Sequence, residues 1–175
     1  MITISLCMIV KNEADVLHRC LSSVEAAVDE IIIVDTGSED ETITIAEAHQ
    51  AKVYSFPWCD DFAAARNFAF SKAKCMYCMW LDADDVILPK DQEGFQRLKE
   101  TLCPETDMVM MKYHTAFDSS GKPTFSYYRE RLIANHKGYQ WVGAVHEIIP
   151  PTGNIYYSDD AAISHKKLRV QDPDR

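Results

Sequence analysis

The sequence lacks several features that define common classes of protein. No segment of the 175 residues approaches the roughly 18 consecutive apolar residues that a membrane-spanning helix needs. The opening residues, MITISLCMIVKNEADV, have no basic region before their apolar stretch, so we do not expect a secretion signal. Repeats and low-complexity tracts are also missing. These absences favour a globular domain without an integral membrane segment.

Positive charge and glycine are scarce where two familiar classes need them. Lysine and arginine total 18 against 27 acidic residues, which gives a net charge of −9. We therefore expect no nucleic-acid partner, because such binding relies on cationic contacts to phosphates. The segment MIVKNEAD, after the first expected strand, contains no glycine. A nucleotidyltransferase or a Rossmann dehydrogenase places a glycine-rich phosphate loop there, so both classes are disfavoured.

Cysteine usage points to a reducing compartment. The six cysteines are Cys7, Cys20, Cys59, Cys75, Cys78 and Cys103. Without a secretion signal, free thiols and a cytoplasmic location are the simpler expectation. The Cys75–Cys78 pair has the spacing of a zinc or redox motif, but no second pair or close histidine pair accompanies it. Core packing is therefore the favoured interpretation of this pair.

The first half of the chain alternates short apolar runs with helical patterns. Strands are expected at residues 2–10, 30–35, 51–56 and 77–81. Helices are expected after Asn12 as a capping residue, at 38–50 behind a Ser38–Glu41 capping box, and at 61–73. This order predicts an α/β fold with a mixed, mostly parallel sheet flanked by helices.

The pattern changes after Asp85. A helix is expected at 89–102, followed by a strand pair at 108–115 and 125–134 and then by shorter pieces. We interpret these as a smaller, more antiparallel part of one domain, residues 1–165, with halves at 1–88 and 89–165. The tail, residues 166–175, has no clear apolar face and is expected to be a truncation point.

Acidic residues stand where two of the expected parallel strands end. Asp35 and Asp82 should meet in one crevice, because ligands of such sheets bind outside the carboxyl ends of the strands. In an extended backbone Asp82 and Asp84 would point to the same side, and Asp85 adds charge beside them. Such carboxylates suit Mg²⁺ or Mn²⁺, which bridge to phosphates. The alternative is an acidic loop that caps the next helix.

Four segments together resemble a known family. They are ISLCMIVKNEADVLHRCLSSV, DEIIIVDTGSEDETITIA, FAAARNFAF and MWLDADD. In this order, over residues 2–88, they resemble a family-two glycosyltransferase of the GT-A fold, the nucleotide-diphospho-sugar transferase fold. The later stretch RERLIANHKGYQWVGAVHE resembles a bacterial subgroup often joined to tetratricopeptide repeats, which this sequence does not contain.

The resemblance implies a hexosyltransferase-type enzyme that moves a sugar from a nucleotide-sugar donor, most simply a UDP-sugar, to an acceptor hydroxyl. The implied reaction inverts the anomeric centre and depends on Mg²⁺ or Mn²⁺. The acceptor stays open among a glycan, a lipid, a peptide and a small molecule. The alternative is a catalytically silent module of the same fold that binds nucleotide or glycan.

The resemblance also assigns roles in binding the donor. The implied nucleotide-binding residues are Val10, Asn12, Glu13, Asp35, Arg66, Asn67 and Asp82. Asp35 would accept a hydrogen bond from uracil or ribose, and Arg66 with Asn67 would lie near the base and the diphosphate. Each has a plainer alternative: Asp35 caps the next turn, and Arg66 lies on a helix surface or pairs with Asp60 or Asp61.

The implied metal ligands are Asp84, Asp82 and the late histidine His165; a surface or structural histidine is the alternative. The family base is usually the Asp of a Glu-Asp pair, and His146-Glu147 stands in that region instead. Glu147 is the expected catalytic base, with His146 orienting it or touching phosphate. The alternative is that both residues alternate along a strand.

Two further pairs leave their roles open. Arg129 and Arg131 should share one face of a strand, either to hold a phosphate or carboxylate or as a solvated surface. Tyr139 and Trp141 suit either stacking on a sugar or packing in the core.

Overall fold

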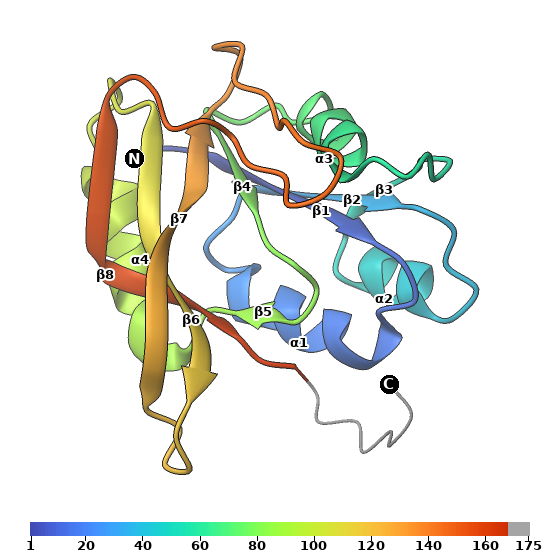
Figure 1. The fold of residues 1–175 in the computed structure, drawn as a ribbon, viewed down its shortest axis with the longest axis horizontal. Coiled ribbons are helices and arrows are strands. Elements are labelled where there is room, and N and C mark those ends of the chain that lie inside the picture. Colours follow the sequence, from blue (N-terminus) through green and yellow to red (C-terminus); the bar gives the residue numbers. More distant parts are fainter. Residues whose placement is uncertain (168–175) are drawn as a thin grey trace.

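The computed structural model describes residues 1–167 as one α/β unit (Figure 1). Its elements, in chain order, are β1 (Ile4–Val10), α1 (Ala14–Val24), β2 (Glu30–Asp35), α2 (Thr42–Ala48), β3 (Lys52–Ser55), α3 (Phe62–Phe70), β4 (Tyr77–Trp80), β5 (Asp85–Val86), α4 (Pro89–Thr101), β6 (Met108–Phe117), β7 (Pro123–Ala134) and β8 (Ile155–His165). Every expected strand and helix up to residue 134 is present, with ends shifted by a few residues.

All the strands join a single mixed sheet in the order β3-β2-β1-β4-β7-β6-β8-β5. The first four are parallel, as their buried apolar runs predict. β7 is antiparallel to β4 and to β6, whereas β8 runs parallel to β6. The mostly parallel sheet with a more antiparallel C-terminal part is therefore confirmed. The boundaries of the two proposed halves stay a prediction.

Helices cover both faces of the sheet (Figure 1). Apolar stripes on α1 and α4, exemplified by Leu17 and Phe95, pack on one face together with Ala46 of α2. On the other face Ala69 of α3 packs against Cys78 and its neighbours. The 3.6-residue spacing of these stripes explains why they form helices. The loops that follow β1, β2 and β4 lie close together, and Lys11, Thr36 and Asp82 from them line one pocket.

The expected helix caps are wrong, because the capping groups come from a different loop. Asn12 does not cap α1; its backbone has a φ of 54° and its N–H donates to the Ser38 hydroxyl at 2.9 Å. The N–H groups of Glu13 and Ala14 donate to Thr42 and Asp40. The hydroxyl of Ser38 is thus occupied outside α2, and the predicted capping box does not form. The loops after β1 and β2 instead stabilise each other.

The chain between β7 and β8, residues 135–154, also departs from expectation. It contains no strand apart from one bridge between Val142 and Ile148, so the idea that His146 and Glu147 alternate along a strand is wrong. We call this segment the β7–β8 loop. None of the helices described in residues 1–167 is both long and apolar enough to span a bilayer. Of the predicted tail, residues 168–175 lie outside the described residues.

Candidate active site

Two adjoining clefts lie at the carboxyl ends of the parallel strands. The acidic cleft, about 340 Å³, is lined by residues that include Val10, Glu13, Asp82, Asp84 and His165. The loop cleft, about 500 Å³, is lined by residues that include Arg129, His146 and Glu147. Phe62, Arg66 and Asp82 line both clefts. Most of the residues singled out from the sequence therefore gather around one continuous depression.

The acidic run after β4 forms a turn. The N–H of Asp85 donates to the carbonyl of Asp82 at 3.0 Å, so the expected extended backbone is wrong here. The turn sends the carboxylates to different partners. Asp82 pairs with Arg66 at 2.8 Å, and Asp84 faces His165 at 3.2 Å. Both carboxylates still line the acidic cleft.

Three side chains near this turn form a possible cation site. Ligand atoms of Asp84, Asp85 and His165 lie within 4.8 Å of one another, the only such group in residues 1–167. Asp82 is not part of it. Two carboxylates and an imidazole form a donor set that fits Mn²⁺ and is acceptable to Mg²⁺. Hydrogen bonds to Asp84 and Asp85 raise the pKa of His165 to about 9, so a proton occupies the site at neutral pH.

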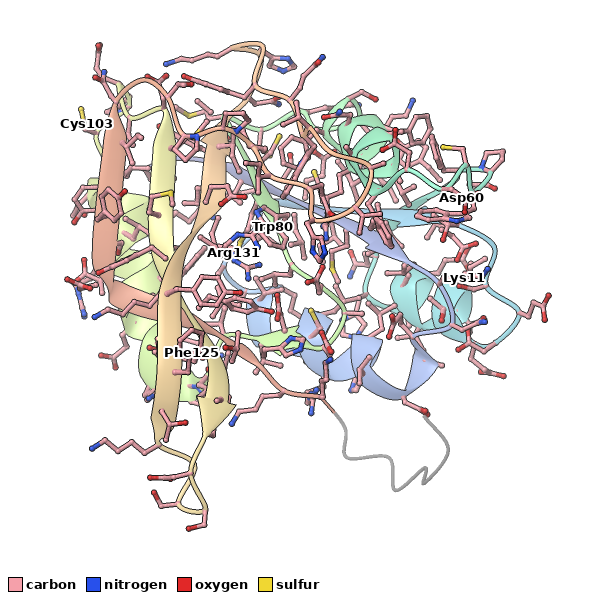
Figure 2. All side chains as sticks on the ribbon, viewed as in Figure 1. Lys11, Asp60, Trp80, Cys103, Phe125 and Arg131 are labelled. Atoms are coloured by element: carbon pink, nitrogen blue, oxygen red, sulfur yellow. The ribbon has the colours of Figure 1, made fainter. Side chains whose placement is uncertain are left out.

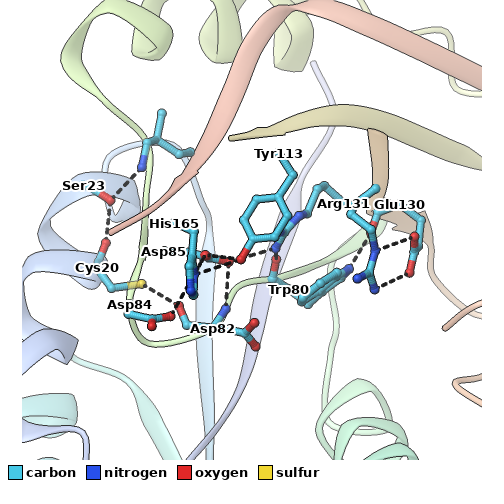
Figure 3. Close-up of polar contacts among 12 residues, drawn as sticks. Cys20, Ser23, Trp80, Asp82, Asp84, Asp85, Tyr113, Glu130, Arg131 and His165 are labelled. Carbon is cyan, nitrogen blue, oxygen red and sulfur yellow. Dashed lines mark hydrogen bonds and ion pairs between the residues drawn. The ribbon is translucent and has the colours of Figure 1, made fainter. Parts of the chain in front are cut away.

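Asp85 is the hub of a buried polar network behind this site (Figure 3). Its carboxylate accepts hydrogen bonds from Tyr113 at 2.9 Å, Arg131 at 3.1 Å and the N–H of Asp82 at 3.1 Å. Burial alone would raise its pKa, but the bond to His165 and the charge of Arg131 outweigh burial and lower it. The sequence signal for Asp85 was the acidic run itself. Tyr113 has no recognisable sequence signal.

Arg129 and Arg131 of β7 both lie against the ring of Trp80, but neither expected role describes Arg131. It is fully buried, pairs with Asp85, and stacks on Trp80 with 3.8 Å between the guanidinium carbon and the ring centroid. Figure 2 shows Arg131 and Trp80 together in the middle of the molecule. Arg129 is partly exposed, binds Glu130, and lines the loop cleft. Arg131 is thus a structural cation rather than a solvated or ligand-binding one.

Arg66 of α3 connects the two clefts. Its Nη2 donates to Asp82 at 2.8 Å and its Nε donates to Glu147 at 2.7 Å. The guanidinium carbon lies over the rings of both Trp80 and Trp141, 4.8 and 4.9 Å from their centroids. Burial lowers the pKa of Arg66, but the charges of both carboxylates outweigh this effect and raise it. The alternative, a surface position or a pairing with Asp60 or Asp61, is wrong, since Arg66 is 6% exposed and its ion pairs are with Asp82 and Glu147.

The two candidate residues for the catalytic base, His146 and Glu147, lie on the β7–β8 loop. Glu147 has a side chain that is 14% exposed and is fixed by Arg66. His146 is exposed, with a φ of 57°. Trp141, earlier in the loop, is buried against Trp80 with ring centroids 5.1 Å apart, and Tyr139 packs on the same cluster. Core packing is therefore the confirmed interpretation for Trp141.

Other predicted nucleotide-binding residues have partners within the protein. Asp35 accepts hydrogen bonds from the N–H groups of Gly37 and Ser38, which is the turn-capping alternative. Asp35, Asn12 and Asn67 are not among the residues that line the acidic cleft. Their roles toward a nucleotide stay predictions. Glu13 does line the cleft, and burial with the charges of Asp84 and Asp82 raises its pKa.

Core packing, the favoured interpretation of the Cys75–Cys78 pair, is confirmed for Cys78. Cys78 is buried in the core, Cys75 is partly buried, and all six thiols are free. Burial is also the main reason that the pKa of Cys7, next to Cys78, is raised.

Comparison with known proteins identifies the class to which this site belongs. Residues 5–160 match the family described as glycosyl transferase family 2. The chain belongs to this family. The chain is 49% identical, over 88 residues, to a TPR repeat-containing protein of Synechococcus elongatus, a match that covers 50% of this chain and 22% of that protein. A lipopolysaccharide core biosynthesis glycosyltransferase, LpsC of Rhizobium meliloti, is 27% identical over 172 residues, covering 92% of this chain and 62% of LpsC.

Solved structures confirm the GT-A fold. Staphylococcus aureus TarS 1-349 in complex with UDP-GlcNAc matches with a TM-score of 0.68 at 16% identity, over 95% of this chain and 59% of that one. Mannosyl-3-phosphoglycerate synthase from Rubrobacter xylanophilus matches with a TM-score of 0.52 at 24% identity, over 66% and 41%. The chain thus spans less than two thirds of the length of these relatives.

Proposed function

We propose that this chain is an inverting, metal-dependent hexosyltransferase domain that uses a UDP-sugar donor. The observation that carries the proposal is the Arg66 bridge, which joins a carboxylate of the acidic cleft to one of the loop cleft. A donor in the acidic cleft and an acceptor in the loop cleft would meet at this point. The complex of TarS 1-349 with UDP-GlcNAc supports the choice of a UDP-sugar.

We propose Asp84 and His165 as residues that would hold Mn²⁺ or Mg²⁺, with Asp85 adjacent. When bound, the ion would neutralise the charge that develops on the departing diphosphate. Asp82 has a different role in this scheme. Its ion pair with Arg66 keeps it at the boundary between the clefts, where a ribose or a sugar would lie. Val10 and Glu13 line the wall of the same cleft.

Glu147 is the proposed general base. It would accept the proton of the acceptor hydroxyl while that oxygen attacks the anomeric carbon. The new carbon–oxygen bond forms as the bond to the diphosphate oxygen breaks, so the configuration inverts. Arg66 fixes the orientation of the Glu147 carboxylate at 2.7 Å. His146, exposed beside it in the loop cleft, is placed to contact the acceptor or a phosphate.

The same ion pair supports a second candidate function, a module that binds nucleotide or glycan without turnover. Glu147 already has a cationic partner in this structure, whereas a working base must be able to approach a substrate proton. The two candidates share the acidic cleft and differ only in the transfer step. The acceptor class and the cytoplasmic location stay predictions.

Calorimetric titration of UDP, with and without Mn²⁺, tests the part that both candidates share. We expect Mn²⁺-dependent binding, with CDP, GDP and ADP binding more weakly. A folded sample that binds none of the four with Mn²⁺ present would overturn both candidates. Release of UDP from a panel of UDP-sugars then separates them, because only the enzyme turns a donor over.

A further inference from the structure

Helix α3 holds the β7–β8 loop at three points, close together in sequence. The N–H of Phe62 donates to the carbonyl of Ala144 at 3.0 Å. Arg66 donates to Glu147, as described above. Asn67, the next residue, makes the third attachment through its side chain. The helix that closes the acidic cleft therefore also sets the position of the loop that carries the candidate base.

The Asn67 attachment uses both polar atoms of its carboxamide. Nδ2 donates to the carbonyl of Trp141 at 3.0 Å, and Oδ1 accepts from the N–H of Trp141 at 2.8 Å. The Asn67 carboxamide thus satisfies both backbone polar groups of Trp141, as a neighbouring strand would. Trp141 is only 2% exposed, so water cannot replace these bonds without opening the loop. The ring of Trp141 is held as well, by Phe70 and Trp80.

A short hydrogen-bonded path leads from this clamp to Glu147. Val142 follows Trp141, and Ile148 follows Glu147. The backbones of Val142 and Ile148 exchange two hydrogen bonds, at 2.9 and 3.1 Å, which close the loop on itself. A shift of Trp141 would therefore move Ile148 and with it Glu147. The other end of the path is fixed by Arg66.

We propose that Asn67 is a positioning residue for the transfer step, which it supports by clamping Trp141 and so holding Glu147 in place. The proposal rests on the proposed role of Glu147. It differs from the role that resemblance assigns, because Asn67 lies outside the residues lining the acidic cleft and both polar atoms of its amide bond to Trp141. Asn67 should therefore affect turnover more than donor binding.

The test compares Asn67→Ala with a control, Gln92→Ala. Gln92 also binds backbone through its side-chain amide, donating to the carbonyl of Ser23, but it lies on α4, outside both clefts and the β7–β8 loop. Three quantities are measured in each variant: the Kd of UDP with Mn²⁺, the kcat of UDP release from a UDP-sugar that the wild type turns over, and the hydrogen exchange of the Trp141 and Ile148 amides.

For Asn67→Ala we expect a kcat at least tenfold lower, a Kd within twofold of the wild type, and at least tenfold faster exchange at both amides. Gln92→Ala should leave all three near the wild-type values. A Kd that weakens as much as kcat falls would overturn the proposal, because it would make Asn67 a nucleotide contact. Unchanged exchange at Ile148 would overturn the mechanical path.

The test can still be read if the variant does not fold or if the wild type is inactive. If Asn67→Ala does not fold, Asn67→Asp keeps the acceptor for the Trp141 N–H, removes the donor to its carbonyl, and is read by the same criteria. If the wild type turns over no UDP-sugar, the proposed transferase function fails, whatever the role of Asn67. The exchange data then still decide whether Asn67 clamps the loop, since they do not depend on activity.

Discussion

The buried pair of Asp85 and Arg131 offers a sharp test of how the site is held together. Both side chains are 0% exposed, and the pair lies 3.1 Å apart behind the acidic turn. Removing one member of such a pair typically costs about 3–5 kcal/mol, because the other charge is left uncompensated. Asp85→Asn, which keeps the shape, and Arg131→Met, which keeps the packing on Trp80, should each destabilise the protein by about that amount.

The double variant, Asp85→Asn with Arg131→Met, tests whether the two charges act as a pair. With both charges gone neither is left unpaired, so its cost should resemble that of one single variant rather than the sum, with a coupling of about 2 kcal/mol or more. Urea unfolding, followed by far-UV circular dichroism, measures the free energy of unfolding of the two single variants and the double variant. Fluorescence is a poorer probe, because Trp80 would also report the local change. Asp159→Asn, at the exposed ion pair with Lys112, is the control and should unfold at the wild-type urea concentration.

Single-variant costs that add to within about 0.5 kcal/mol would refute this reasoning, because additivity is the behaviour of independent sites. Small costs for both single variants would refute it too. Either result would mean that Tyr113 and His165 satisfy Asp85 without Arg131.

Three further outcomes follow from the site. Glu147→Gln should keep the UDP affinity and stop turnover in a UDP-release assay; near wild-type turnover would remove Glu147 as the base. Asp84→Ala should weaken Mn²⁺ binding at least tenfold in calorimetry, while Asp159→Ala should not. The pKa of His165 is raised to about 9 in the fold, above the roughly 6.5 of a free histidine, so its stabilisation is complete below pH 6.5 and lost as pH rises through 9. The Tm difference between wild type and His165→Gln should therefore shrink over that window, and a constant difference would contradict the assignment.

Local patterns predicted the fold well where local physics decides it. Buried apolar runs and 3.6-residue stripes identified the parallel half, because each element shows its buried face in its own sequence. The caps failed for the opposite reason. Asn12 and Ser38 do bond, but to each other's loops, 26 residues apart in the chain. A capping rule that looks three residues ahead cannot find such a partner.

The site was predictable in its membership and less so in its connections. Asp82, Asp84, Arg66 and Glu147 were all singled out, and all line the two clefts. Which carboxylate meets which cation depends on the turn at residues 82–85 and on β7 lying beside β4. Neither feature can be recognised from one segment of the sequence alone. The pairing of Asp85 with Arg131 could be predicted only from the order of the strands in the sheet.

The arrangement of cations explains how an acidic turn holds together in a chain of net charge −9. Asp82 pairs with Arg66 from α3, Asp85 pairs with Arg131 from β7, and among residues 1–167 the only cationic partner of Asp84 is His165 from β8. The first two cations are permanent, whereas the third depends on a proton. A divalent ion would therefore enter by replacing the His165 proton and not by breaking an arginine pair. Because proton and ion compete for the same place, the affinity of the site for Mn²⁺ should rise with pH toward 9.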